Sequence, residues 1–342
     1  MFDRPVVAPR VRVGIVSWNT ADLLAHCLAA LPEALGSCPA EVVVVDNASS
    51  DASGAVAERH HGVRVIANRV NVGYATAMNQ ALGRTTAEVL IALNPDTVAP
   101  PGSLEALVGR LMSQPDVALV VPELVYPDGS AQQSVYRFPS AATSCAEHVY
   151  WAKPGVGRLR RRLWFRGTAG ADGSGDVDWA IGAVHVLRRA ALAGRAAYRE
   201  RWFMYNEDLD LCWTLAAGGW RRRLEADIKV VHVRNAAARQ RWGHDPSAWA
   251  LAGTYDWFAM VHGTRAARRW ASLNIVGSLG HGLALAGGSF LASRSDRRTR
   301  ALVLWAQLPL HVRAMVLGPP APVPPPDPTR RPPRSLPTSP WR

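Results

Sequence analysis

Residues 11–51 read VRVGIVSWNTADLLAHCLAALPEALGSCPAEVVVVDNASSD, the pattern of a strand, a helix and a second strand. The runs at 11–17 and 41–46 are rich in β-branched residues and almost continuously apolar, as strands are when helices cover both faces of their sheet. Between them, the apolar residues of 21–31 recur with helical spacing. This stretch therefore predicts a unit of a parallel α/β sheet.

The same alternation continues to residue 122. Further strands are expected at 63–67, 88–93 and 117–122, and further helices at 53–60, 74–82 and 104–112. We therefore expect an α/β fold with a mainly parallel twisted sheet flanked by helices.

Polar residues follow three of these strands, as SWN (17–19), DNAS (46–49) and NPD (94–96). Ligands of open α/β sheets bind just beyond the carboxyl ends of the strands. The three clusters therefore predict one binding site at one edge of the sheet.

Composition divides the chain into three parts. The alternating pattern and a less regular continuation occupy 1–235, and 236–318 is expected to be a helical extension. The tail 319–342 has 11 prolines in 24 residues, which predicts disorder.

Charge is unevenly distributed along the chain. Residues 1–150 carry 9 arginines and 14 acidic residues, a net charge of −5, whereas 151–342 carry 30 basic and 13 acidic residues, a net charge of +17. This asymmetry indicates an anionic partner, such as phosphates or a membrane surface. No RNA-binding motif, zinc finger or helix-turn-helix pattern is present, so we expect no nucleic-acid partner.

The cysteines and the N-terminus bear on the compartment. The four cysteines form no CxxC pair, and no long apolar run precedes the strand at 11–17. We therefore expect free thiols, no signal peptide and a site that faces the cytoplasm.

Residues 270–293 contain no Asp, Glu, Lys or Arg, so their length alone permits a membrane span. The stretch nevertheless holds five glycines, and its larger apolar residues, Val276, Leu279, Leu283 and Phe290, recur with helical spacing. A one-sided stripe favours a packed or interfacial helix over a span.

Two segments, the polar cluster at 46–49 and the residues before the helix at 74–82, suit a nucleotide. Asp46 stands at a strand end, where its carboxylate suits a base imide or a ribose hydroxyl; Ser49, Ser50 and Asp51 are explained by helix capping, but Asp46 is not. Asn71 and Gly73 precede the helix at 74–82, whose first amides suit an anion.

The NPD cluster suggests a cation site. Asn94 and Asp96 are two positions apart, so on an extended segment both side chains lie on one face. Oxygen ligands of this kind, completed by a diphosphate and water, suit Mg²⁺ or Mn²⁺. A simple turn is the alternative.

Three carboxylates, Glu207, Asp208 and Asp210, open a predicted helix. Clustered like charges cost energy unless a function or a counter-charge holds them, which favours catalysis. Stabilisation by the helix dipole is the alternative. His232 lies in the β-branched run VVHV (230–233). A lone histidine is more often structural than a ligand, and only its occurrence together with the aspartates above makes His232 a candidate site residue.

At these residues the chain resembles family 2 glycosyltransferases of the GT-A fold, particularly the bacterial rhamnosyltransferase-like branch. The resemblance covers about residues 11–235. It rests on VGIVSWNTADLLAHCLAAL, VVVVDNASSD, NVGYATAMNQAL, LIALNPDT, DWAIGAVHVLRR, FMYNEDLDLCWTLAAGGW and VVHV, in family order.

The resemblance implies that 1–235 is a GT-A catalytic domain that transfers one sugar with inversion, from dTDP-rhamnose or a UDP-sugar to a glycan or lipid-linked acceptor. Asp208 would be the general base, and Asp96 and His232 would hold Mg²⁺ or Mn²⁺. The donor-binding residues would be Ser17, Asn19, Asp46, Asn71, Gly73, Asn94 and Asp96. The acceptor and sugar pocket would be formed by Trp179, Gly182, Ala183 and Glu207.

Two features depart from the family pattern. The metal motif NPD has one acid where a DxD motif has two. RQRW (239–242) resembles the QxxRW of processive polymerases, but its glutamine is misplaced, which favours transfer of a single sugar.

Two other functions are alternatives. A sugar nucleotidyltransferase shares the alternating sheet but needs a Gly-rich phosphate loop after the first strand, where this chain has SWNTAD. An inactive nucleotide-binding or scaffold protein would not need Asp96, Asp208 and His232 together.

A basic loop suggests a membrane partner. Its arginines are Arg158, Arg160, Arg161, Arg162 and Arg166, interleaved with Leu159, Leu163, Trp164 and Phe165. Arginines with large apolar side chains suit an anionic bilayer surface. We expect a peripheral protein on the inner face of the plasma membrane, active in cell envelope polysaccharide synthesis; a loop that closes over the donor is the alternative.

Overall fold

The computed structural model describes residues 10–144, 173–233, 247–290, 302 and 304–320, in two compact units. The first unit comprises Met1–Tyr136, Phe165–Glu200 and Glu207–Ala237, and the second comprises Arg137–Trp164, Arg201–Asn206 and Ala238–Arg342. The second unit thus includes two segments from within the predicted domain 1–235.

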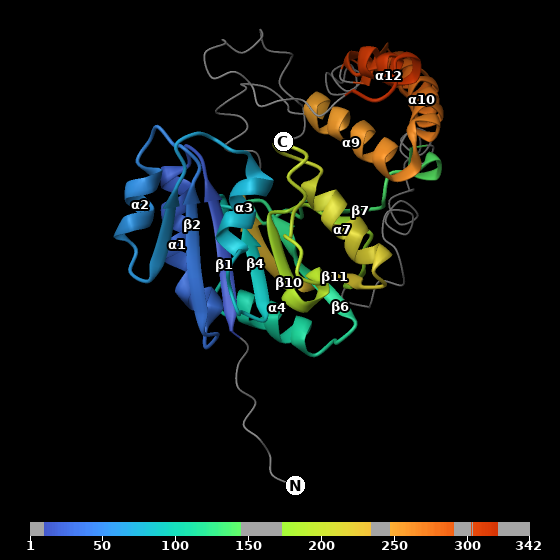
Figure 1. Cartoon of the computed structure of the whole chain (residues 1–342). Coiled ribbons are helices and arrows are strands. Elements are labelled where there is room, and N and C mark those ends of the chain that lie inside the picture. The colour runs from blue at the N-terminus through green and yellow to red at the C-terminus, as the bar shows by residue number, and fades with distance from the viewer. Residues whose placement is uncertain (1–9, 145–172, 234–246, 291–301, 303, 321–342) are drawn as a thin grey trace. The chain divides into compact units, whose positions relative to one another are not determined.

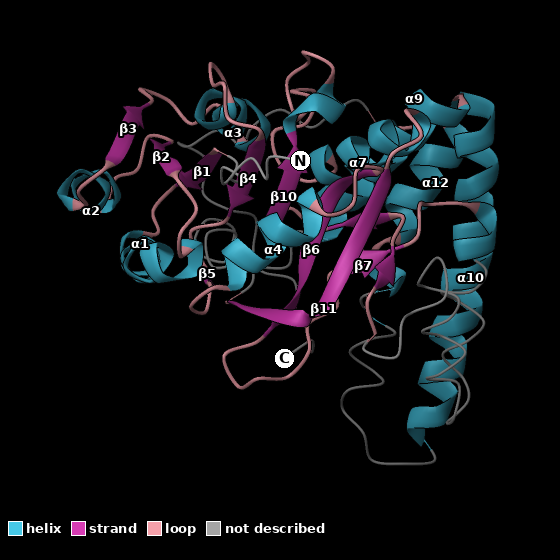
Figure 2. Ribbon diagram, turned by 90° about the horizontal axis from the view of Figure 1, so that it is seen from below, coloured by secondary structure: helices cyan, strands magenta, loops and turns pink. Residues whose placement is uncertain are grey.

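A nine-stranded sheet forms the centre of the first unit, with the order β3-β2-β1-β4-β10-β6-β11-β5 and with β8 paired to β11 (Figures 1 and 2). The strands are β1 Val11–Ser17, β2 Ala40–Asp46, β3 Val63–Ala67, β4 Val89–Leu93, β5 Thr97–Val98, β6 Val117–Val125, β8 Gly175–Asp176, β10 Val184–Arg188 and β11 Arg221–His232. Strands β1 to β4 pair in parallel, as does β6 with β11, whereas β10 runs antiparallel to β4 and β6. The predicted mainly parallel sheet is confirmed.

Where this unit is described, it has five α-helices: α1 Ala21–Leu35, α2 Ser53–Arg59, α3 Tyr74–Leu82, α4 Ser103–Met112 and α7 Glu207–Ala217. The first four agree with the sequence prediction except at their ends. The largest difference is in α1, which continues through Pro32 and ends four residues later than expected.

Alternation along β1 assigns the helices to the two faces of the sheet. Val13 and Ile15 are fully buried in one core cluster with leucines of α1 and α4. Gly14 points to the other face, where an added Cβ would lie 2.9 Å from both Ala81 Cβ and Leu82 Cδ2 of α3. A glycine is therefore required for the close packing of α3 on β1.

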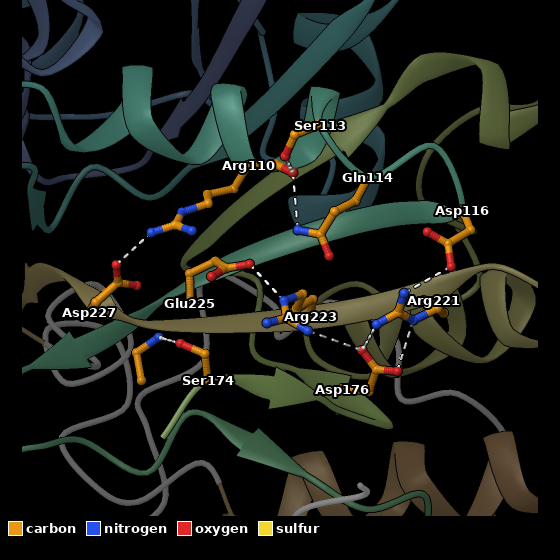
Figure 3. A network of polar contacts seen from close by, with 11 residues as sticks. Arg110, Ser113, Gln114, Asp116, Ser174, Asp176, Arg221, Arg223, Glu225 and Asp227 are labelled. Carbon is orange, nitrogen blue, oxygen red and sulfur yellow. Dashed lines mark hydrogen bonds and ion pairs between the residues drawn. The ribbon is translucent and has the colours of Figure 1, made fainter. Parts of the chain in front are cut away.

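Ion pairs fix the beginning of β11 (Figure 3). Arg221 donates to Asp176 of β8 and to Asp116, just before β6. Arg223 is 2.8 Å from Glu225 and 4.0 Å from Asp176. Because the arginines are partly exposed, water screens each pair and its contribution to stability is small, but together the pairs orient a strand whose other end carries the predicted site residue His232.

The second unit contains three described helices, α9 Ser247–His262, α10 Thr264–Phe290 and α12 Leu308–Val316, which pack side by side (Figures 1 and 2). Aromatic rings fill their interface: Phe258 and Trp270 stack at 4.6 Å between centroids. Tyr255 is fully buried, and its hydroxyl lies 2.8 Å from His311 Nδ1 and accepts a hydrogen bond from Asn274. The predicted helical extension is therefore a packed helical layer.

Helix α10 contains the uncharged stretch that begins at residue 270. Its packed side includes the buried Trp270, whereas the predicted stripe of Val276, Leu279 and Leu283 is exposed. The stripe is therefore not packed within this unit. Among the described residues, no helix combines the length and apolar character of a membrane span.

Three predictions concern residues outside the described ones. These are the arginines of 158–166, the RQRW segment at 239–242, and the tail apart from Pro319 and Pro320.

Candidate active site

The carboxyl ends of β1 and β2 lie together at one edge of the sheet. Ser17 and Asp46 are register partners there. Asn19 adopts a left-handed conformation, with φ 53°. Its Oδ1 accepts from the Ser50 amide at 2.7 Å, and its own amide donates to Ser49 Oγ at 3.0 Å. The first two predicted polar clusters therefore form one bonded surface.

Asp46 has a structural role within this surface. Its Oδ1 accepts from the Ser49 amide at 3.1 Å, and its Oδ2 would lie 2.9 Å from a Cβ at Gly54. Asp46 therefore also stabilises the turn after β2, a role separate from helix capping by Ser49, Ser50 and Asp51, and its contact with a nucleotide stays a prediction.

Asn47 joins this edge to the loop before α3. It is 2% exposed, and its Nδ2 donates to Asn71 Oδ1 at 2.9 Å and to the Gly73 carbonyl. Its Oδ1 accepts from Asn68 Nδ2 and from the Val72 amide. Asn47 was not among the predicted site residues, although its position directly after a strand-end aspartate was a usable signal.

The NPD segment forms a turn, which corrects the expectation of an extended chain. The Thr97 amide donates to the Asn94 carbonyl, and the Asn94 amide donates to the Ala183 carbonyl. Asn94 Oδ1 is buried without a hydrogen-bond partner among the described residues. Asn94 and Asp96 thus do not share a face through strand periodicity, although both follow β4.

Strand pairing brings His232 to Asp96. Thr97 of β5 is the register partner of His232 in β11, and His232 Nε2 lies 3.3 Å from Asp96 Oδ1. His232 Nδ1 lies 2.6 Å from Gln132 Oε1. An amide oxygen only accepts, so Nδ1 carries a proton. In the neutral imidazole, the Nε2 lone pair then faces a carboxylate oxygen.

Two facing lone-pair donors fit a divalent cation, and the orphaned Asn94 Oδ1 is a further buried oxygen after the same strand. Among the described residues no group of three or more His, Cys, Asp or Glu side chains is placed to hold a metal ion. The protein therefore offers Asp96 and His232 as a pair, and other ligands would come from a bound diphosphate and water.

Asp208 lies in the first turn of α7, and two backbone amides donate hydrogen bonds to its carboxylate. The Leu209 amide donates to its Oδ1 at 2.8 Å, and the Gly182 amide donates to its Oδ2 at 3.1 Å. Asp208 is 9% exposed, and burial raises its pKa to about 6 despite both hydrogen bonds. This carboxylate is ionised at neutral pH yet basic enough to accept a proton.

The three clustered carboxyl groups, those of Glu207, Asp208 and Asp210, differ in their hydrogen-bond and ion-pair partners. Burial, and then the charge of Asp208, raise the pKa of Glu207 well above its usual value. Glu207 Oε2 is buried without a partner among the described residues. Asp210 forms an ion pair with Arg199 at 2.9 Å. Ionisation of Glu207 is therefore disfavoured and Asp210 is paired with an arginine, which is consistent with the prediction of Asp208 as the base.

Tyr74, the first residue of α3, links these groups. Its hydroxyl donates to the Gly182 carbonyl at 3.1 Å. Burial raises its pKa, and the charges of Glu207, Asp208 and Asp96 raise it further. Tyr74 therefore lies in the electrostatic field of both the predicted base, Asp208, and the predicted metal ligand, Asp96. Tyr74 was not among the predicted site residues, because an aromatic residue at the start of a helix is more often part of a core.

The predicted acceptor residues precede β10. Trp179 lies in β9 (Trp179–Ala180), which pairs with β7 (Val135–Tyr136), and its ring stacks on Tyr136 at 4.8 Å. Ala183 precedes Val184, the register partner of Leu93 in β4. The antiparallel strand β10 thus brings Gly182 and Ala183 to the same edge as Asn94.

This fold and site define a glycosyltransferase of the GT-A type. Residues 12–175 match the family model described as Glycosyl transferase family 2. The chain is 30% identical over 255 residues to the N-acetylglucosaminyl-diphospho-decaprenol L-rhamnosyltransferase of Mycobacterium tuberculosis strains CDC 1551 and H37Rv, with 68% of this chain and 79% of the relative covered. The chain belongs to glycosyl transferase family 2.

A solved structure supports the fold. The mannosyltransferase PcManGT from Pyrobaculum calidifontis, in complex with GDP-Man and Mn²⁺, superposes with a TM-score of 0.56 at 18% identity, over 91% of this chain and 88% of that one. The family and the fold together decide against the nucleotidyltransferase and scaffold alternatives.

Proposed function

We propose that this enzyme transfers a single rhamnose, with inversion, from a nucleoside-diphosphate sugar to a hydroxyl of a lipid-linked glycan acceptor. One observation carries this proposal: of three neighbouring carboxyl groups, only Asp208 both lacks a cationic partner among the described residues and accepts hydrogen bonds from two backbone amides, with its pKa raised to about 6. The activity for which the mycobacterial relatives are named supports rhamnose and a lipid diphosphate acceptor.

The donor lies along the edge formed by β1, β2 and the loop before α3. Ser17, Asn19 and Asp46 contact its nucleoside, and Asn71 with Gly73 lies near its phosphates, because the loop and the first amides of α3 favour an anion. Asn94 joins Asp96 in this donor set. dTDP-rhamnose is the first choice of donor, and UDP-sugars are the alternative.

Asp96 and His232 would hold Mg²⁺ or Mn²⁺ at the donor diphosphate. When bound, the cation stabilises the charge that develops on the departing nucleoside diphosphate, without a proton transfer. Gln132 keeps His232 oriented, because its Oε1 accepts from the Nδ1 proton and thereby leaves Nε2 as a ligand.

The acceptor hydroxyl approaches Asp208 over the floor made by Gly182 and Ala183, with Trp179 beside it. Asp208 Oδ2 removes the hydroxyl proton as the new glycosidic bond forms on the face opposite to the leaving group. Glu207 contacts the acceptor beside Asp208, and burial and the charge of Asp208 raise the pKa of Glu207 well above the usual value. A lipid-linked acceptor places the enzyme on the inner face of the plasma membrane, as a peripheral protein.

A transfer assay tests this function. The full chain, with Mn²⁺ or Mg²⁺, is supplied with dTDP-rhamnose, UDP-glucose or UDP-galactose and an N-acetylglucosaminyl-diphospho-prenyl acceptor, and NMR gives the anomeric configuration of the product. We expect a rhamnosylated product of inverted configuration. A retained configuration, or transfer from UDP-hexoses alone, would overturn the proposed mechanism or donor respectively.

A further inference from the structure

The exposed side of α10 carries two kinds of residue in sequence. Arg265, Arg268 and Arg269 lie in its first two turns and are exposed. Val276 and Leu283 follow with exposed fractions of 71% and 64%, and Leu279 lies between them at 43%. Spacings of three, four and seven residues place this set on one side of the helix, which we call the outer face of α10.

Packing on the opposite side fixes this orientation. Ala267, Trp270, Ala271, Asn274 and Ser278 are buried in the second unit. They alternate with the outer face along the helix, so rotation of α10 would bury arginines and expose Trp270. The exposure of large apolar side chains is therefore built into the packing and needs a partner of its own.

Charge narrows the choice of partner. Helix α10 contains no Asp or Glu from Thr264 to Phe290, so the outer face is positive at one end and apolar at the other. A second copy would bring like charges together. An anionic phospholipid surface complements both ends, because arginines contact the headgroups while valine and leucine enter the interface.

We infer that the outer face of α10 is the surface by which this protein binds an anionic lipid bilayer. This inference rests on the proposed lipid-linked acceptor, since binding at the bilayer concentrates the enzyme where that acceptor lies. It assigns membrane contact to described residues of the second unit, independently of the arginines of 158–166.

Vesicle sedimentation tests the inference. The full chain is mixed with phosphatidylglycerol vesicles and, separately, with phosphatidylcholine vesicles, at low and high salt. We expect salt-sensitive binding to phosphatidylglycerol. Val276→Glu/Leu283→Glu should weaken it at least tenfold, and Arg265→Gln/Arg269→Gln by roughly 10- to 30-fold. Matched controls on the first unit, Met112→Glu and Arg84→Gln/Arg195→Gln, should bind like the wild type.

Two further measurements separate the outcomes. Rhamnose transfer to a water-soluble, short-chain acceptor should be unchanged in all four variants, which shows that each folds. Undiminished vesicle binding by both α10 variants would overturn the inference. It would also be overturned if sedimentation velocity showed a dimeric wild type and monomeric α10 variants, because this face would then join two copies. Vesicle binding without any sugar transfer would instead refute the proposed function and leave the surface intact.

Discussion

The backbone amide of Gly182 donates to Oδ2 of Asp208 across 3.1 Å, and the carbonyl of the same Gly182 accepts from Tyr74. One residue of the proposed acceptor floor therefore orients the proposed base and is itself held by α3. An added Cβ at Gly182 would lie 3.6 Å from Asp208 Cβ, so the floor and the base are in direct contact.

The pKa of Asp208 predicts the pH dependence of turnover. Burial raises this pKa to about 6, and only the ionised form accepts a proton. With saturating donor and acceptor, kcat should fall about tenfold per pH unit below about 6 and level off above it. A flat profile from pH 5 to 8 would exclude Asp208 as the base.

The same shift predicts a pH-dependent gain in stability for Asp208→Asn. Because the folded-state pKa is raised from 3.8 to about 6, the folded state holds more protons in that window, and the wild type loses stability as pH rises through it. The unfolding free energy of the variant relative to the wild type should therefore increase by on the order of 2–3 kcal/mol between pH 4 and 7.5. Urea unfolding at both pH values measures this; Asp22→Asn, on the exposed side of α1, is the control and should show no such change.

Asp96→Ala should abolish metal-dependent donor binding. His232 would remain as a neutral ligand without a carboxylate beside it, which is too little for a hard cation. Calorimetric titration with dTDP-rhamnose, with Mn²⁺ and then with a chelator, measures the effect. Equal affinity of wild type and variant in both conditions would show that the cation is bound elsewhere.

Two glycines give a stability test of the fold. Gly14→Ala should destabilise the protein by about 1–3 kcal/mol, because the new methyl group would meet Ala81 and Leu82 at 2.9 Å. Gly109→Ala, in the interior of α4, meets nothing within 4 Å and should stabilise by about 0.5–1 kcal/mol. Thermal unfolding should give a Tm below that of the wild type for Gly14→Ala and above it for Gly109→Ala. A destabilised Gly109→Ala would show that α4 packs differently.

The sequence predicted the parallel half of the sheet well, because buried strands and amphipathic helices have distinct local patterns. It did not predict that β10 runs antiparallel between β4 and β6, which depends on long-range pairing. The same limit applies to the site. Asp96, Asp208 and His232 stood out as strand-end or clustered ionisable residues, whereas Gln132 and Tyr74 act through partners far along the chain.

The turnover of Asp208→Asn tests the central claim most directly. Donor affinity and kcat are measured on the same preparation, with Asp22→Asn as the matched control. We predict that kcat falls by roughly 10²–10⁴-fold while the Kd for dTDP-rhamnose stays within about twofold, because the variant loses only the proton acceptor. Near-normal kcat with unchanged donor affinity would contradict the account and place the base elsewhere, with Glu207 and Asp210 as the next carboxylates to test.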